Sequence, residues 1–353
     1  MSRTPSAEPA SGTAAPATGA PAGRDGQPRW YRRVPDEAGV LLVLVLLVGG
    51  VGTFHPDFLR TQNLLSTTQN SVYIGLMACG MVFPLAMREV DLSLGGVYAL
   101  GIVAGAVLIR DGLAPWLAVP AILLLATALG CLNGAVTTYL RLPSFIVTLA
   151  SAMLFRGVAL ALADGKQISG LPTGDSYFTV LGEKVAGVPA SVWVLLAATA
   201  VLSLVFTRTR FGARVRAIGS NPEAAEFSGL PIARTRIAAL GLSGFMGGTA
   251  AVLGLAFYTA GDPTVGNGYE LTAIAACIIG GTPLAGGRGS VTGAMLGNLV
   301  LTTVAASLVF FQVPINWTTF ATGAVILVAV AFDSVLRRTR GRSLLPRRTR
   351  EIR

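Results

Sequence analysis

The chain has 353 residues, of which 52% are hydrophobic and only 12% are charged, and its mean hydropathy is +0.65. A soluble domain carries about 25% charged residues, so this composition excludes an ordinary soluble protein and indicates a membrane protein. The net charge of +10 comes from arginines that cluster in short loops and tails between apolar runs. That placement is typical of the cytoplasmic side of a membrane protein rather than of a nucleic-acid-binding face, so no nucleic-acid partner is expected.

The two ends of the chain differ in composition from its middle. Residues 1–36 are rich in Ala, Pro and Gly without apolar periodicity, which predicts a disordered cytoplasmic tail. A signal peptide is the alternative, but the polar leader is long and no clear cleavage site follows residue 50. Residues 337–353 carry eight arginines and are expected to form a basic cytoplasmic tail. The membrane domain is therefore expected over residues 37–336.

Apolar runs long enough to cross a bilayer as helices follow one another through this domain. They do not alternate apolar with polar residues as barrel strands do. The stretch 289–332 is free of charge and too long for one crossing, and Gln312, Pro314 and Asn316 divide it into two. Ten spans are expected, an all-α fold: 38–54, 71–87, 92–109, 114–132, 142–163, 190–206, 237–260, 271–287 and two within 289–332.

The positive charges predict the orientation of these spans. An even number of crossings leaves both termini on the same side. With both termini in the cytoplasm, 22 Arg and Lys residues lie inside and four lie outside, and Arg156 falls within a span. This asymmetry follows the positive-inside rule.

Two loops between the spans are long, 164–189 outside and 207–236 inside. The inner loop contains Gly219–Gly229 (GSNPEAAEFSG), which is expected to form a short amphipathic helix on the inner face. Asn221 suits the N-cap, Pro222 and Glu223 suit the first turn, and Gly229 suits the C-terminal stop. The outer loop is a candidate docking surface.

Polar residues near the spans leave alternatives open. Asp91-Leu92-Ser93 and Glu270-Leu271-Thr272 are alike, either as a weak internal repeat of the kind found in transport paths or by chance. Each acid could cap or pack a helix rather than line a path. A mid-span arginine costs about 2.5–3.5 kcal/mol, so Arg156 should meet a partner, face a wet cavity or snorkel outward.

Catalytic and metal-binding signatures are missing from the sequence. The only Gly-Lys pair, Gly165-Lys166, is followed by Gln167, so no phosphate-binding P-loop is present. His55 is the only histidine, and Cys79, Cys131 and Cys277 each lie in an apolar stretch, where a small buried hydrophobe is expected. We therefore expect no catalytic residue, metal or cofactor in this chain.

Seven segments between residues 65 and 335 together resemble the permease subunit of bacterial ABC importers of the ribose/xylose type. They are VDLSLG (90–95), GCLNG (130–134), LPSFIVTL (142–149), FRG (155–157), Gly219–Gly229, GYELTAIAA (268–276) and GGTPLAGGRG (280–289). The sequence departs from the family pattern at Arg88-Glu89, where the family usually has Gly-Gly, and at Thr272 and Pro283.

The resemblance implies about ten helices, some of them broken and lining a path that works by alternating access in the bacterial inner membrane. The implied partners are a second permease copy (a homodimer), two ATPase subunits that hold ATP and Mg, and an outer sugar-binding protein, besides membrane lipid. It implies an ATPase-coupling helix with Asn221, Pro222, Glu223, Ala224, Ala225, Ser228 and Gly229. It implies a path or gate near Asp91, Ser93, Asn133, Phe145, Arg156, Tyr269 and Glu270.

Other functions stay open at this point. Related permeases carry nucleosides, autoinducer-like sugars or branched-chain amino acids, although the Asp-Leu-Ser and Tyr-Glu-Leu segments favour simple sugars. An ion-driven secondary transporter would need more acids within the membrane than this sequence offers. A membrane enzyme would have to depend on His55.

Overall fold

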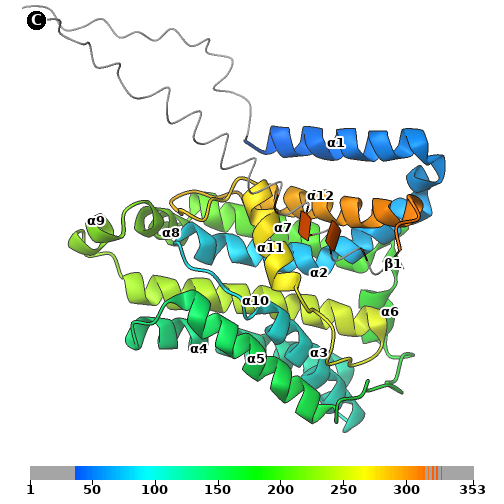
Figure 1. The fold of residues 1–353 in the computed structure, drawn as a ribbon. Coiled ribbons are helices and arrows are strands. Elements are labelled where there is room, and N and C mark those ends of the chain that lie inside the picture. The colour runs from blue at the N-terminus through cyan, green and yellow to red at the C-terminus, as the bar shows by residue number, and fades with distance from the viewer. Residues whose placement is uncertain (1–35, 315–316, 318–319, 322, 325–326, 328–353) are drawn as a thin grey trace, which may run out of the picture. The chain divides into compact units, whose positions relative to one another are not determined.

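The computed structural model describes residues 36–314, 317, 320, 321, 323, 324 and 327. These residues are predominantly helical, with one two-stranded hairpin (Figure 1). In chain order the elements are α1 (Asp36–Phe54), the 3-10 turn η2 (Pro56–Leu59), α2 (Thr61–Ala86), α3 (Leu94–Arg110), α4 (Pro115–Tyr139), α5 (Ser144–Leu162), α6 (Ser176–Gly182), β1 (Lys184–Val185), β2 (Val188–Pro189), α7 (Ala190–Arg208), α8 (Arg210–Ser220), α9 (Pro222–Phe227), α10 (Ile232–Tyr258), α11 (Tyr269–Ile279) and α12 (Val291–Phe310).

Seven helices within the described residues are long and apolar enough to cross a membrane: α1, α2, α4, α5, α7, α10 and α12. Two further expected spans form the shorter helices α3 and α11, of 17 and 11 residues. The tenth expected span falls largely outside the described residues. The prediction of a helix over 271–287 was wrong in its length. Gly280 caps α11, and Gly281, Gly286 and Gly287 all take positive φ in the loop that follows.

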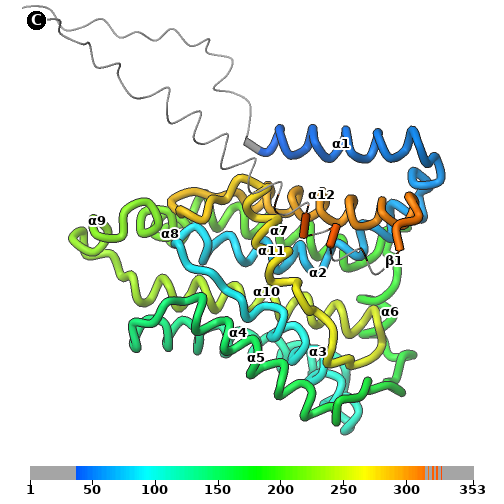
Figure 2. Tube along the Cα trace, in the orientation of Figure 1, coloured from blue at the N-terminus to red at the C-terminus, as the bar shows by residue number. Residues whose placement is uncertain are grey.

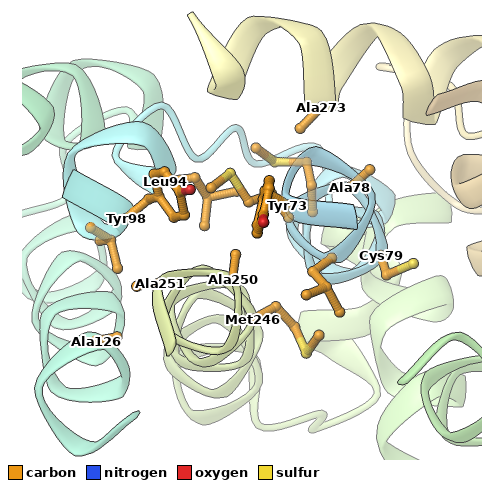
Figure 3. Packing of buried hydrophobic residues seen from close by; sticks show 14 of the residues in the cluster. Tyr73, Ala78, Cys79, Leu94, Tyr98, Ala126, Met246, Ala250, Ala251 and Ala273 are labelled. Carbon is orange, nitrogen blue, oxygen red and sulfur yellow. The ribbon is translucent and has the colours of Figure 1, made fainter. Parts of the chain in front are cut away.

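The long helices α2 and α10 form the centre of the bundle. Most of the side chains in the C-terminal two thirds of α2 are fully buried, and α10 is buried along most of its length. Figure 3 shows Tyr73 of α2 and Tyr98 of α3 beside the small Ala250 and Ala251 of α10, while Cys79 of α2 points away from α10. In contrast, α1 and α5 expose long apolar faces, as helices do that meet lipid or another subunit.

Small residues allow α4 and α10 to approach closely. A Cβ atom on Gly244 would lie 3.1 Å from the Cα of Gly130, and one on Gly134 would lie 2.7 Å from the Cα of Ile237. Small residues serve this purpose between helices in lipid, where close van der Waals packing drives association. The richness of the sequence in glycine is thus used at the helix interfaces.

The two long loops lie at opposite ends of the bundle. Figure 1 shows α8 and α9 at one end, and α6 with the β1–β2 hairpin at the other. The α6 loop is held down because the Tyr177 hydroxyl donates a 2.6 Å hydrogen bond to the carbonyl of Val252. This arrangement agrees with the expectation that the loops 164–189 and 207–236 are on opposite sides of the membrane.

Candidate functional site

Asp91 anchors a buried polar cluster just before α3. Its Oδ1 accepts hydrogen bonds from the Ser93 amide at 3.0 Å and from the Ser93 hydroxyl at 2.6 Å. Asn133 of α4 donates to the Ser93 Oγ at 2.9 Å, and the Ser151 hydroxyl of α5 donates to the Asn133 side-chain oxygen at 2.6 Å. Asp91, Ser93 and Asn133 are each at most 1% exposed. Three predicted site residues thus form one network that joins α3, α4 and α5.

Burial governs the charge of this cluster. Asp91 lies in the linker 87–93, outside the helices that could cross the membrane. Burial raises the pKa of the Asp91 carboxyl above its ordinary value, while hydrogen bonds from Ser93 and from Ser243 of α10 oppose that shift. The predicted capping role is only indirect, because Ser93 occupies the N-cap of α3 and Asp91 orients Ser93.

The same linker is tied to the beginning of α5. The Val90 amide donates to the Ser144 hydroxyl at 3.0 Å, and the Leu92 amide donates to the Thr148 hydroxyl at 3.0 Å. These two acceptors belong to the segment LPSFIVTL, which the sequence had singled out. Backbone donors that would otherwise be unsatisfied in a buried linker are therefore paired by the motif.

Arg156 and Glu270 meet at a second polar site, between α5 and the beginning of α11. The Arg156 guanidinium donates to the Asn267 side-chain oxygen at 2.7 Å and to the Gly266 carbonyl at 3.2 Å. The Glu270 carboxylate lies in the same region, against Gly95 of α3. The mid-span arginine therefore has polar partners, one of the alternatives that the sequence had left open.

The remaining predicted path residues are divided. Tyr269 is half-buried, and its ring centroid lies 5.7 Å from that of Tyr98, within a cluster that also holds Tyr73 and Tyr258. Phe145 is 51% exposed at the start of α5, and the structure does not bring it to either polar site.

The predicted short helix of the inner loop is present as α9, with the expected caps. The Asn221 side chain accepts from the Ala224 amide at 3.0 Å, Pro222 is the first helical residue, and Glu223 is in the first turn. Ser228 is the C-cap and Gly229 follows with φ +70°. Gly219 and Ser220, which precede this N-cap, belong to the preceding helix α8. The α8 helix itself was not predicted.

The α9 helix is unusual in what it exposes. Of its six residues only Ala225 is buried, and Phe227 is 93% exposed. A large aromatic side chain is thus left almost entirely uncovered at the end of the bundle, with the exposed Glu223 and Glu226 beside it.

Arg88 and Glu89 are functional candidates that sequence reasoning noted only as a departure from the family pattern. Arg88 donates to the carbonyls of Gly219 and Ser220 at the end of α8, and Glu89 forms a 2.7 Å ion pair with Arg236 of α10. These partners lie more than 130 residues away, so no local signal could have identified them. Among the described residues, no group of three or more His, Cys, Asp or Glu could hold a metal ion.

Comparison with known proteins agrees with this architecture. Residues 63–330 match the family described as "Branched-chain amino acid transport system / permease component". The chain is 34% identical to the ribose import permease protein RbsC of Bacillus subtilis, over 85% of this chain and 93% of that protein. It is 32% identical to the L-arabinose transport system permease protein AraH of Escherichia coli (86% and 92%) and 31% identical to the xylose transport system permease protein XylH of the same species (85% and 91%).

A solved structure shares the fold. It is described as an inward-facing conformation of a putative metal-chelate type ABC transporter, with a TM-score of 0.50 and 15% identity, over 84% of this chain and 98% of that chain.

These observations define a polytopic membrane permease, a helical bundle with buried polar clusters and an exposed helix at one end. The chain belongs to the permease-component family whose description is given above. It is a multi-pass protein of the bacterial inner membrane.

Proposed function

We propose that this chain is the membrane-spanning subunit of an ATP-driven importer for a monosaccharide. The observation that carries this proposal is the similarity to ribose, arabinose and xylose permeases at 31–34% identity over about 85% of the chain. The match includes more than 90% of the length of each of these relatives, so the similarity covers the whole membrane domain rather than one motif.

The chain itself supplies a path and not an ATPase. ATP and Mg would be held by separate ATPase subunits on the cytoplasmic side, and an outer binding protein would deliver the sugar. Transport then requires that the path open alternately to either side as the ATPase subunits close and open. The α6 loop, at the opposite end of the bundle from α9, is suited to receive the binding protein.

The ATPase would dock on α9. The exposed Phe227 supplies an apolar anchor of the kind that dominates protein interfaces, and the acidic Glu223 and Glu226 supply a rim. The N-cap at Asn221 and the turn at Gly229 keep this six-residue helix ordered, although it is too short to be stable on its own.

A second copy of the chain would complete the path. One open face of α5 is apolar and consists of Ala150, Met153, Leu154, Gly157, Val158 and Ala161. Arg156 lies on the same helix, and an arginine held against lipid tails is costly. A path between two copies at this face would keep Arg156, Glu270 and Tyr269 close to water and to the hydroxyl groups of a sugar.

The test is reconstitution. The chain would be co-expressed with an ATPase of the sugar-importer type from the same genome and purified in detergent. Wild-type chain should retain the ATPase, and Phe227→Ala or Glu223→Arg should release it. Proteoliposomes that also receive the binding protein should take up radiolabelled ribose, arabinose or xylose with ATP inside. Uptake of leucine instead, or uptake abolished by a proton ionophore and indifferent to ATP, would overturn the proposal.

A further inference from the structure

Three chain segments meet beside the root of α9, where Figure 2 shows the end of α2 passing close to α8 before the linker continues to α3. We call this meeting point the junction, and it consists of residues 86–89, 219–220 and 286–287. The Gly287 amide donates to the Ala86 carbonyl at 2.8 Å. The Arg88 Nε donates to the Gly219 carbonyl at 2.7 Å, and a terminal nitrogen of Arg88 donates to the Ser220 carbonyl at 2.9 Å.

The three backbone segments of the junction lie in close contact, although the side chains of Arg88 and Ser220 are exposed. A Cβ atom on Gly286 would lie 2.6 Å from the Arg88 Cγ, and one on Gly287 would lie 2.7 Å from the Ser220 Oγ. A Cβ atom on Gly219 would overlap the Ala86 carbonyl. Because backbone atoms lie against backbone atoms here, one segment cannot shift without moving the other two.

Arg88 stands at a position that the backbone reserves for glycine. The Glu89 amide donates to the Pro84 carbonyl and the Arg88 amide to the Leu85 carbonyl, which is the Schellman pattern at the end of α2. Arg88 occupies the left-handed position of that pattern with φ +65°. Glycine takes this conformation most readily. An arginine in this conformation is more strained than a glycine would be, but its guanidinium donates two hydrogen bonds to the end of α8.

Glu89 holds the other side of α9. Its carboxylate forms a 2.7 Å ion pair with the Nε of Arg236, and the two side chains are only 14% and 26% exposed. Arg236 lies in the second turn of α10, the helix that follows α9 along the chain, while Gly219 and Ser220 precede α9. Arg88 and Glu89 therefore contact the chain both before and after the helix that would dock the ATPase.

The same linker leads directly to the buried cluster. Val90, the next residue, is bonded to Ser144 of α5, and Asp91 follows with its bonds to Ser93. The third segment of the junction, with Gly286 and Gly287, lies in the loop that follows α11. Glu270 is in the first turn of α11. Both polar sites are thus connected by short segments to the part of the chain from which α9 begins.

We propose that Arg88 and Glu89 are positioning residues that transmit the displacement of α9 to the Asp91 cluster and to α11, so that ATP-driven closure moves the path. This inference rests on the proposed function of α9. It predicts that the two residues set how many sugar molecules move per ATP, while leaving ATPase docking to α9 itself.

Arg88→Gly separates this role from a merely structural one. Glycine relieves the left-handed backbone and keeps the Schellman turn, but removes both hydrogen bonds to α8. In the reconstituted complex, we expect Arg88→Gly to retain the ATPase and its ATP hydrolysis. Sugar uptake per ATP should fall by about tenfold or more. Arg88→Lys should give an uptake per ATP between those of the wild type and Arg88→Gly, because a lysine ammonium cannot reproduce the paired hydrogen bonds of the planar guanidinium.

Arg141→Gly is the matched control. Arg141 is also left-handed, with φ +55°, in the short linker between α4 and α5, and its exposed side chain makes no hydrogen bond or ion pair to any residue that the structure describes. This variant should transport as the wild type does. For the ion pair, Glu89→Arg and Arg236→Glu should each uncouple uptake, and the double variant should recover at least half of it.

The outcomes distinguish the inference from the proposed function. Failure of the wild-type chain to retain any ATPase sinks the proposed function. Retention by the wild type, loss in Phe227→Ala and unchanged uptake per ATP in Arg88→Gly sink the inference alone. Release of the ATPase by Arg88→Gly also counts against the inference, because the residue would then hold the docking surface instead of transmitting its movement.

Discussion

The ends of α2 and α9 have the same backbone geometry and different residues at the decisive position. At the end of α9 the Gly229 amide donates to the Glu226 carbonyl and the Leu230 amide to the Ala225 carbonyl, the same pattern that Arg88 and Glu89 complete at the end of α2. The left-handed residue has φ +70° in one and +65° in the other. No atom of the described residues lies within 4 Å of where a Gly229 Cβ would stand. The Arg88 side chain, in contrast, lies against Gly286 at its Cγ and donates two hydrogen bonds from its guanidinium.

The difference shows what each turn is for. At Gly229 the turn has only to end a helix, and glycine does this at the least conformational cost. Position 88 has an arginine, although the left-handed conformation costs a residue with a Cβ about 1 kcal/mol or more. Arg141 has the same conformation without such contacts, so the pair of hydrogen bonds to α8, rather than the left-handed φ alone, distinguishes Arg88.

The largest effect is expected from Gly219→Val. It disrupts the junction in which Arg88 forms its hydrogen bonds, and so removes one of the two turns from the comparison. A valine side chain would overlap the Ala86 carbonyl, and neither partner is a flexible side chain that could move aside. Overpacking of this kind costs about 3 kcal/mol at its upper range. Thermal unfolding in detergent should show a clearly lowered midpoint. Gly49→Val, in open space on α1, is the control and should change the midpoint little.

Gly229→Arg tests whether the turn alone explains the residue at position 88. Because a Cβ at position 229 would meet no atom within 4 Å and no carbonyl fork like that at Arg88, the variant should mainly incur the left-handed strain, about 1.5 kcal/mol of destabilisation. The measurement is thermal unfolding together with ATPase retention. Gly229→Asn, which tolerates positive φ better, should lose less stability. A Gly229→Arg protein as stable as the wild type would show that an arginine needs no contact in this turn.

Asn221→Ala sharpens the comparison from the opposite end of α9. The substitution removes the side-chain acceptor of the Ala224 amide and should cost about 1 kcal/mol. Since α9 has few other contacts, we expect local fraying there, measurable as faster amide hydrogen exchange at residues 223–227 with α10 unaffected. Asn221→Ser should restore slow exchange. Equal exchange in Asn221→Ala and the wild type would contradict a capping role.

The smallest effect is expected from Arg141→Gly, in which an unengaged left-handed arginine becomes glycine. Relief of backbone strain should outweigh the greater flexibility of the unfolded chain only slightly, with a gain of about 0.5 kcal/mol. A matched pair of unfolding curves for Arg141→Gly and Arg88→Gly would measure what the two hydrogen bonds of Arg88 contribute. A marked loss of stability in Arg141→Gly would mean that the left-handed conformation does not strain an arginine that has no contacts.

Features encoded by neighbouring residues were predictable from the sequence. The caps of α9 at Asn221, Pro222 and Gly229 follow from local preferences, and the structure has all three. The family resemblance singled out Asp91, Ser93 and Asn133, which the structure joins in one network. Hydropathy alone extended α11 to residue 287, because it does not register the positive φ angles of Gly281, Gly286 and Gly287.

Contacts between distant segments were not predictable in this way. Arg88 meets Gly219 across 131 residues, and Glu89 meets Arg236 across a similar separation. The amphipathic α8 helix was overlooked because its arginines were interpreted as loop charge, while Val215 and Ile218 are the residues that it buries. Phe145 belonged to a family motif, but the motif serves the linker through Ser144 and Thr148 instead.

The glycines of the junction bear on how faithfully motion crosses it. A joint made of long side chains has play, since rotamers can rearrange and absorb a displacement before it reaches the next element. Between Ala86, Gly219 and Gly287 there are hardly any rotatable side-chain bonds to do so. The backbone part of the junction should therefore be stiff, and the rotamer freedom that remains is largely confined to the side chains of Arg88 and Glu89, which their hydrogen bonds and ion pair restrict.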